Sequence, residues 1–441
     1  MEIKNVKGTH DILSKEGRIY DSVKHVLTVL SEIFAYHYVE PPVLEHSELF
    51  VRSVGESSDV VRKEMYTFED KGGRSLTMRP EFTAGIARMI VQNKLLATNE
   101  LPLKYFYHGP VFRYERPQLG RFRQFLQFGV ESVGTNNPYN DVEVIVLAYA
   151  CLNSLGFNDV RVKINTLGDE ESRNAYRLAL KEFFKDKIDQ MCPDCKQRYE
   201  LNPLRILDCK VPEDQEIVKD APKMSDYISN ESKLRFQKVL EALKTNDIPY
   251  DIDDTLVRGL DYYSETVFEF HYVSNTGNNY GAIGAGGHYD KLISELGGPN
   301  VPGVGFSFGL ERIVSIMIDN GLMNPDFNYL DFYVMPLGEA AQNYAHYVAN
   351  EIRKHSMMVD ICYEQVKMGN MFKRAEKKNA AFAIIIGEDE VNNESIVLKN
   401  LKTKEQFTYK FEDFKEEMKN GAFSRLDFDS NDNDSEERFD S

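Results

Sequence analysis

A long strand–turn–strand segment between residues 105 and 133 limits the possible folds most strongly. Residues 105–114 and 124–133 read as strands, and the polar residues between them include Gly120 and three arginines. We expect an antiparallel hairpin in which alternation places Gln127, Gly129 and Glu131 on one face. Because the rest of these strands is largely apolar, a polar row indicates that this face lines a pocket rather than a core.

The basic turn of this hairpin stands out because the chain as a whole is acidic. The 53 Lys and Arg against 70 Asp and Glu give a net charge of −17, which excludes a protein coated in positive charge. Residues 113–123 hold four arginines and one glutamate, a local net of +3. Guanidinium groups bind phosphate or carboxylate through paired donors, so the turn favours an anionic ligand. A solvated basic turn without a ligand is the alternative.

Helical and strand patterns alternate through the first three quarters of the chain. Apolar spacing predicts a helix over 16–38 that leads, through Pro41-Pro42, into a strand, and another helix over 141–155. Charged helical sequence between 170 and 250 indicates an inserted helical domain. Beyond it, strands at 266–273 and 304–308 are expected with glycine turns between them, and a helix is expected from Leu310.

The last quarter of the chain has a different pattern. Short apolar strands at 332–335, 358–362 and 382–386, separated by helical segments, predict a small α/β domain with a largely parallel sheet. Residues 426–441 hold seven acids and one arginine, so we expect a disordered acidic tail. The expected boundaries are 1–325 with the insertion at 170–250, then 328–424, then the tail at 425–441.

No segment indicates export or a bound metal ion. No window approaches 18 uninterrupted apolar residues, and the first residues lack the apolar core of a signal peptide, so we expect a cytoplasmic protein. The five cysteines are too few, and odd in number, for a disulfide scaffold. Cys192, Cys195 and Cys209 are three potential zinc ligands, but a fourth Cys or His is missing nearby. We therefore expect no metal and favour reduced thiols.

Two further segments centre on arginines. Arg258 lies in Leu-Val-Arg-Gly-Leu-Asp-Tyr-Tyr-Ser, and burying an unpaired guanidinium costs several kcal/mol, so it should meet a carboxylate or a phosphate. The adjacent Tyr262 and Tyr263 are equally explained as strand residues that cover a core. Arg312 follows the glycine-rich run 303–309, where a flat ligand could approach the backbone. Neither segment matches a Walker A or dinucleotide pattern, so we favour phosphate binding by separated arginines.

These segments together resemble a known family. Phe112-Arg113-Tyr114-Glu115 with Arg121, and Gly-Phe-Ser-Phe-Gly-Leu-Glu-Arg at 305–312, resemble motifs 2 and 3 of class II aminoacyl-tRNA synthetases, and the helix into Pro41-Pro42 resembles motif 1. Residues 256–264 and Gly-Gly-His-Tyr-Asp at 286–290 resemble two signatures of histidyl-tRNA synthetases. The resemblance covers residues 8–313. It implies an α+β catalytic domain with an antiparallel sheet and a helical insertion, and residues 330–424 resemble the family's α/β anticodon-binding domain.

The resemblance also implies a reaction, its substrates and its residues. The reaction is the ATP- and Mg²⁺-dependent ligation of L-histidine to tRNA(His), carried out by a homodimer that pairs through motif 1. Arg113 and Arg258 would act at the α-phosphate. ATP would be held by Arg113, Glu115, Arg121 and Arg312. Histidine would be held by Glu81, Thr83, Gln127, Glu131, Arg258, Tyr262 and Tyr263. For tRNA we expect Arg116, Gln118 and Arg123 in the basic turn, and Lys373 and Arg374 in a run with a net charge of +4, for which a solvated helix face is the alternative.

Two departures and one alternative function accompany this interpretation. The second signature more commonly has Arg where this chain has His288, so we leave His288 off the site. Lys223-Met224-Ser225-Asp226 is similar to a class I phosphate loop but lacks its second Lys. The alternative is a histidine-sensing regulatory protein on the same fold, like the regulatory subunit of ATP phosphoribosyltransferase. It is disfavoured because Arg113, Arg258, Arg312 and the C-terminal domain are all present.

Overall fold

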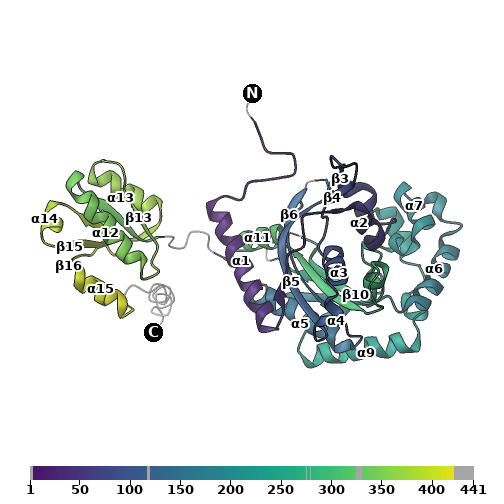
Figure 1. Ribbon diagram of the computed structural model, residues 1–441. Coiled ribbons are helices and arrows are strands. Elements are labelled where there is room, and N and C mark those ends of the chain that lie inside the picture. Colours follow the sequence, from purple (N-terminus) through teal and green to yellow (C-terminus); the bar gives the residue numbers. More distant parts are fainter. Residues whose placement is uncertain (1–2, 117–119, 275, 279, 324–329, 422–441) are drawn as a thin grey trace, which may run out of the picture. The chain divides into compact units, whose positions relative to one another are not determined.

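The computed structural model describes residues 3–116, 120–274, 276–278, 280–323 and 330–421 (Figure 1). The chain divides into two compact units, Met1–Met323 and Asn324–Ser441, which are described here separately. None of the described helices is long and apolar enough to cross a membrane. The predicted acidic tail lies outside the described residues.

An eight-stranded sheet organises the first unit. Its inner strands pair antiparallel, and only the two edge pairs, β1 with β5 and β7 with β8, are parallel among the described residues. In spatial order the strands are β1 (His37–Tyr38), β5 (Leu103–Phe112), β6 (Gln124–Val133), β11 (Gly303–Gly309), β10 (Ala282–Tyr289), β9 (Ser264–Tyr272), β7 (Val160–Thr166) and β8 (Tyr250–Ile252). The predicted antiparallel sheet is therefore confirmed.

The two faces of this sheet carry different side chains. One face packs its apolar residues, including Phe128, Val130 and Phe308, into a core with four helices. These are α1 (Ser14–Ile33), α5 (Pro138–Ser154), α9 (Asn230–Thr245) and α11 (Leu310–Asp319). Because side chains alternate along a strand, Gln127 and Glu131 project from the opposite face, as predicted. That face holds the polar pocket.

The predicted hairpin is confirmed, with Leu103 opposite Val133 and Phe112 opposite Gln124. The predicted helix over 16–38 is too long at its C-terminal end. It ends at Ile33, and Ala35 takes a φ of +62°, which turns the chain so that residues 37–38 join the sheet beside β5.

The glycine-rich run 281–287 was predicted as a turn, and this prediction is wrong. It forms most of β10, an inner strand of the sheet. A Cβ at Gly287 would lie 2.8 Å from the Tyr263 ring, and one at Gly286 would overlap the carbonyl oxygen of Gly305 on the neighbouring strand. Glycine is needed here because neighbouring groups pack directly against the strand.

Smaller elements surround the pocket side of the sheet. A three-stranded sheet has the order β2 (Leu44–His46), β4 (Ser75–Met78) and β3 (Tyr66–Glu69). The helices in the same part of the sequence are α2 (Ser47–Val54), η1 (Val60–Glu64), α3 (Thr83–Gln92) and α4 (Leu95–Thr98). The segment predicted as a helical insertion forms α6 (Glu170–Phe184), η2 (Ile188–Gln190), α7 (Pro193–Leu201), η3 (Pro203–Asp208), α8 (Pro212–Val218), η4 (Met224–Asp226) and α9. A short helix, α10 (Leu292–Glu295), follows β10. Figure 1 shows α6 and α7 grouped on the side of the sheet away from α1.

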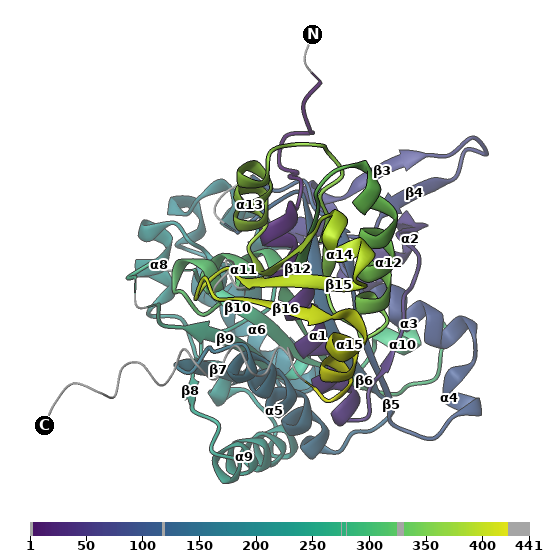
Figure 2. The same ribbon diagram turned by 90° about the vertical axis from the view of Figure 1, so that its left-hand side faces the viewer.

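The second unit is a five-stranded sheet with helices on both faces (Figure 2). Three strands are parallel as predicted: β13 (Val359–Ile361), β12 (Leu330–Pro336) and β14 (Ala380–Ile386). Two antiparallel strands, β15 (Ser395–Asn400) and β16 (Gln406–Lys410), extend the sheet and were not predicted. Helices α12 (Gln342–Arg353) and α15 (Phe411–Lys419) cover one face, and α13 (Met368–Lys377) covers the other. The remaining short helices are η5 (Glu339–Ala341) and α14 (Glu388–Asn392).

Candidate active site

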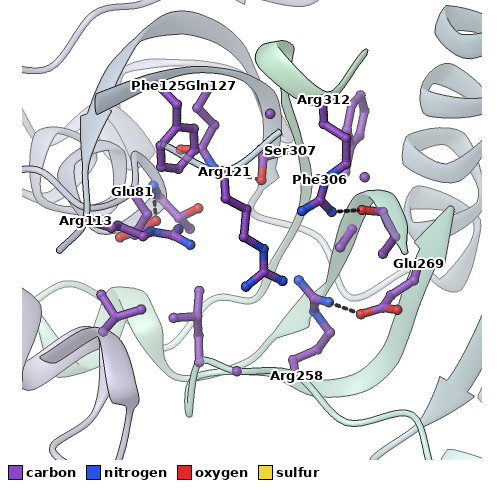
Figure 3. Close-up of a pocket in the computed structure, with 18 of the residues that line it drawn as sticks. Glu81, Arg113, Arg121, Phe125, Gln127, Arg258, Glu269, Phe306, Ser307 and Arg312 are labelled. Atoms are coloured by element: carbon purple, nitrogen blue, oxygen red, sulfur yellow. Dashed lines mark hydrogen bonds and ion pairs between the residues drawn. The ribbon is translucent and has the colours of Figure 1, made fainter. Parts of the chain in front are cut away.

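A pocket of about 430 Å³ opens on the polar face of the eight-stranded sheet. Residues from the turn between β5 and β6, from β6, from β9 to β11, and from the loops before α3 and β9 line it (Figure 3). All the residues expected to bind ATP or histidine are among them: Glu81, Thr83, Arg113, Glu115, Arg121, Gln127, Glu131, Arg258, Tyr262, Tyr263 and Arg312. The fold therefore gathers groups that are up to 231 positions apart in the sequence.

Glu131 lies in a cluster of hydroxyl groups. Its carboxylate accepts hydrogen bonds from Thr83 Oγ1 at 2.6 Å, from the Tyr289 hydroxyl at 2.9 Å and from the Tyr107 hydroxyl at 3.4 Å. Burial outweighs these hydrogen bonds and raises the pKa of Glu131 to about 8. A ligand that brings an N–H donor or a positive charge next to this carboxyl would favour its ionised form.

Glu81 and Gln127 present acceptors near the same place. Glu81 accepts the backbone N–H groups of Thr83 and Ala84 at 2.6 and 2.8 Å, which fixes its carboxylate at the start of α3. Gln127 Nε2 donates to Ser307 Oγ at 2.8 Å, whereas Gln127 Oε1 is buried and has no hydrogen-bond partner among the described residues. An unpaired buried acceptor is costly, so Gln127 is suited to a ligand donor such as an ammonium group.

Three arginines meet at the other end of the pocket. Figure 3 shows the side chains of Arg121, Arg258 and Arg312 pointing toward one another from three separate segments. Arg258 Nη1 pairs with Glu269 Oε1 at 2.6 Å, and its Nε is buried without a partner. Arg312 donates to the carbonyl oxygen of Ala282, and burial, followed by repulsion from Arg121, lowers the pKa of Arg312. Converging positive charges of this kind are stabilised by a polyanion.

Arg113 lies on the opposite wall, near Glu81. Its Nε donates to the carbonyl oxygen of Pro80 at 2.8 Å, and its guanidinium lies 5.5 Å from the centre of the Phe125 ring. Glu115 lies between two arginines, 3.7 Å from Arg113 Nη1 and 3.5 Å from Arg121 Nη1. A flat aromatic group has the Phe125 ring as a stacking surface, with its attached phosphates toward the three converging arginines.

The comparisons with known proteins agree with this geometry. The family model for histidyl-tRNA synthetase matches residues 8–313, and the anticodon-binding-domain model matches residues 331–421. The chain belongs to the histidyl-tRNA synthetase family. The histidine–tRNA ligase of Bacillus licheniformis is 44% identical over 92% of this chain and 96% of its own, and that of Bacillus subtilis is 42% identical over 94% and 97%.

Solved structures place this family member among class II synthetases, as predicted. The apo histidyl-tRNA synthetase of S. aureus matches with a TM-score of 0.80 and 33% identity, over 95% of this chain and all of that one. A Bacillus halodurans chain described as an ATP phosphoribosyltransferase regulatory subunit/histidyl-tRNA synthetase matches with a TM-score of 0.63 and 20% identity, over 88% of this chain and 99% of that one. At that identity the second likeness shows the fold alone.

Among the described residues of this family member, those expected to contact tRNA do not line the pocket. Arg116 is exposed, and Gln118 lies outside the described residues. Arg123 lies 3.7 Å from the centre of the Tyr114 ring, and its Nε donates to the carbonyl oxygen of Glu115 at 3.3 Å. In the second unit, Lys373 is exposed on α13 and Arg374 pairs with Glu364.

Several pocket residues of this synthetase-family chain were not predicted. Tyr289 donates to Glu131, Ser307 accepts from Gln127, and Glu269 pairs with Arg258. Glu269 carried a signal that could have identified it, because it is an acid within the apolar strand Thr-Val-Phe-Glu-Phe. Tyr289 and Ser307 lie in the segments 286–290 and 305–312, which resemble family motifs, but their residue types alone did not single them out.

His288, the departure from the family signature, does not line the pocket. It is fully buried, with Nδ1 3.0 Å from Asp141 and Nε2 3.2 Å from Asp290, and Arg235 Nη2 lies 3.2 Å from Nδ1. Although burial lowers the pKa of His288, Asp141 and Asp290 raise it to about 9. The residue therefore serves as a buried cation that joins β10 to α5, by way of Asp141.

Proposed function

We propose that this chain is a histidine–tRNA ligase. It activates L-histidine with ATP, forming histidyl-adenylate and pyrophosphate, and then transfers the histidyl group to the 3′ end of tRNA(His) with release of AMP. The observation that carries the proposal is the division of one pocket into two ends, a hydroxyl- and carboxylate-lined end around Glu131 and an arginine-lined end around Arg258.

The first end suits histidine. We assign the imidazole to Glu131 and Tyr263, with Tyr262 nearby, because a carboxylate and a phenol together recognise both ring nitrogens. The ammonium group would meet Glu81, Thr83 and the unpaired Oε1 of Gln127. This arrangement leaves the substrate carboxylate toward the arginines, where the reaction occurs.

The second end suits ATP. We assign the α-phosphate to Arg113 and Arg258 and the γ-phosphate to Arg312, with Arg121 and Glu115 at the nucleotide. The carboxylate of histidine attacks the α-phosphorus and pyrophosphate leaves, so no protein nucleophile is needed. Catalysis then depends on alignment and on neutralisation of the charge that develops on the phosphoryl oxygens.

Mg²⁺ would bind together with ATP rather than at a preformed site made of protein ligands alone. Glu269 is already paired with Arg258 and His271, and Glu115 lies between two arginines. Within the described residues, no group of three acidic or histidine ligands gathers in the pocket. One or two carboxylates with phosphate oxygens and water satisfy Mg²⁺, so Glu115 and Glu269 fit this role. The ion would supply positive charge to the phosphates.

Three finer features complete the proposal. The tRNA acceptor end meets Arg116, Gln118 and Arg123, and the anticodon meets the second unit at Lys373 and Arg374. The domains extend over 1–325, with the insertion at 170–250, and over 328–424, with a tail at 425–441, in agreement with the division into compact units at residue 323. The enzyme acts in the cytoplasm.

The chain forms a homodimer through α1 and the strands that follow it. Ile33, Tyr38 and Leu44 in this region are 70%, 46% and 47% exposed, although all three are large apolar residues. Light scattering should give the mass of two 50.7 kDa chains. A mass of one chain at micromolar concentration would contradict this part of the proposal.

Arg258→Ala tests the assignment of the reaction. Loss of this guanidinium should slow histidine-dependent ATP–pyrophosphate exchange by about a thousandfold, because it removes charge from the phosphoryl transition state. Arg161→Ala is the matched control, since Arg161 pairs with Asp251 at an exposed edge of the same sheet. Exchange at the wild-type rate in Arg258→Ala would refute the assignment.

Aminoacylation separates the ligase from the regulatory alternative. Charging of tRNA with labelled histidine by the unmodified chain is expected. Histidine binding without any charging would favour the histidine-sensing protein instead.

A further inference from the structure

We propose that Cys192, Cys195, Cys209 and Asp214 form a structural zinc site. One ligand atom from each of these residues lies within 4.8 Å of the others, and no other such group is present in the described part of the chain. Sequence reasoning rejected a metal because a fourth Cys or His was missing nearby. The folded chain supplies a carboxylate as the fourth donor.

Two of the distances between donor atoms are close to those around a tetrahedral ion. Zinc bonds of about 2.3 Å to sulfur and about 2.0 Å to oxygen place two sulfurs about 3.8 Å apart and a sulfur and an oxygen about 3.5 Å apart. Cys192 Sγ lies 3.9 Å from Cys209 Sγ, and Cys209 Sγ lies 3.2 Å from Asp214 Oδ2. The sulfur separation is about twice the length of a disulfide bond, and the cysteines are free.

The local structure holds the four donors in place. Cys192 precedes α7 as its N-cap, Cys195 is in the first turn of that helix, Cys209 follows η3, and Asp214 is in the first turn of α8. The backbone N–H of Cys195 donates to Cys192 Sγ at 3.4 Å, and that of Cys192 donates to Asp214 Oδ2 at 3.1 Å. Such bonds orient the ligand atoms and stabilise negative charge on them.

Burial also favours a metal over four independent polar groups. Cys195 and Asp214 are 0% and 1% exposed. Apart from the backbone N–H of Cys192, the neighbours of the Asp214 carboxylate in the cluster are thiols, which are weak donors for its charge. Three thiols that lose their protons to solvent and one carboxylate would hold Zn²⁺ with its preferred sulfur-rich ligand set.

A zinc ion here would support one wall of the active-site pocket. It would join α7, η3 and α8, and η3 carries Arg205 and Asp208, both of which line the pocket. Arg205 and Arg198 also bind Asp59, another pocket residue, at 3.4 and 3.1 Å. Metal loss should therefore loosen this wall without removing any group assigned to substrate.

The metal content of the purified full chain tests the site. Protein prepared without chelators should contain about one zinc per chain by plasma mass spectrometry. Cys195→Ser and Cys209→Ser should lose the metal, whereas the control variants Cys151→Ser and Cys362→Ser, at the two buried cysteines outside the cluster, should retain it. Replacement of zinc by Co²⁺ should give the thiolate-to-metal absorption and the visible bands of a tetrahedral site.

Asp214→Asn tests the fourth ligand. It should weaken zinc binding at least about tenfold in competition with a chromogenic chelator, and Asp214→Cys should strengthen binding. Glu213→Gln, at the neighbouring exposed position on α8, should leave the affinity unchanged.

Two outcomes would overturn the proposal, and neither depends on a folded variant. The first is that the unmodified chain contains no zinc and takes up none from added Zn²⁺ under reducing conditions. The second is that peptide mapping of the chain as purified finds a Cys192–Cys209 disulfide. Neither result bears on the ligase activity, which is measured separately by exchange and charging.

Discussion

At the residue scale, two buried ionisable groups show how burial can act in opposite ways. Glu131 accepts hydrogen bonds from hydroxyl groups and pairs with no cation among the described residues, so burial dominates and raises its pKa to about 8. His288 has two carboxylates beside it, and these overcome the cost of burial. The charge of Glu131 can therefore change when a ligand binds, whereas the charge of His288 stabilises the fold.

His288→Gln should remove a pH dependence of stability. The pKa of His288 in the folded chain is about 9, above the usual 6.5. The charged His288 therefore stabilises the fold fully below pH 6.5, and this stabilisation is lost as pH rises through 9. The difference between the two pKa values corresponds to about 3 kcal/mol of folding free energy. Thermal unfolding by circular dichroism should show the wild type losing its advantage over His288→Gln between pH 6.5 and 9.5.

His346→Gln, at an exposed position on α12, is the control for this comparison. It should follow the wild type at every pH. An equal stability difference between wild type and His288→Gln at both ends of the pH range would show that His288 acts through packing rather than through its charge.

At the element scale, glycines in the central strands leave space for the side chains of neighbouring strands and loops, and they do not mark turns. Gly305 on β11 lies opposite Glu131 on β6, and a Cβ at Gly305 would overlap Glu131 Oε2. Gly287 on β10 gives the same room to the Tyr263 ring. The strands thus position the end of the pocket around Glu131 through residues that have no side chain.

Gly305→Ala should therefore impair histidine recognition. The added methyl group would overlap both the Glu131 carboxylate and the carbonyl oxygen of Val130, so both must shift, and overpacking of this kind costs at least about 1–3 kcal/mol. We expect at least about a tenfold lower kcat/KM for histidine in ATP–pyrophosphate exchange, together with a lower melting temperature. Gly369→Ala on α13, where a Cβ would meet nothing within 4 Å, should change neither quantity. Unaltered histidine kinetics in Gly305→Ala would contradict this account.

At the scale of the whole molecule, the net charge of −17 is distributed unevenly, and two regions of the chain are basic. The tail accounts for −6, which leaves −11 for residues 1–425, while residues 113–123 and 367–378 carry +3 and +4. For the proposed tRNA contacts, this distribution means attraction at the two basic regions and repulsion over the acidic remainder of the surface.

Charge reversal of Lys373 and Arg374 to glutamate should raise the KM for tRNA without changing ATP–pyrophosphate exchange. Phosphate contacts depend on salt, so the variant should also show a weaker dependence of tRNA binding on salt concentration. Lys419→Glu on α15, which covers the opposite face of the same sheet, is the control. Unchanged tRNA kinetics in the double variant would rule out α13 as a contact.

The elements of the pocket were predictable from the sequence because local patterns encode them. Alternation placed Gln127 and Glu131 on one face of a hairpin, and the three arginine segments indicated an anionic ligand before any fold was known. The C-terminal α/β unit was likewise evident from its spacing. The two antiparallel strands β15 and β16 were not, because short, exposed edge strands carry little apolar pattern.

Residue pattern by itself thus determined which chemical groups this protein brings to a ligand, since side-chain type and strand period are local properties. Only the tertiary structure decided which groups meet. In the fold, a glycine run forms an inner strand and Arg258 pairs with Glu269. His288 is buried away from the pocket, and Asp214 lies beside three cysteines. Such pairings depend on packing between segments that are distant in the sequence, or on turns within irregular segments. The periodicity of the sequence therefore does not predict them.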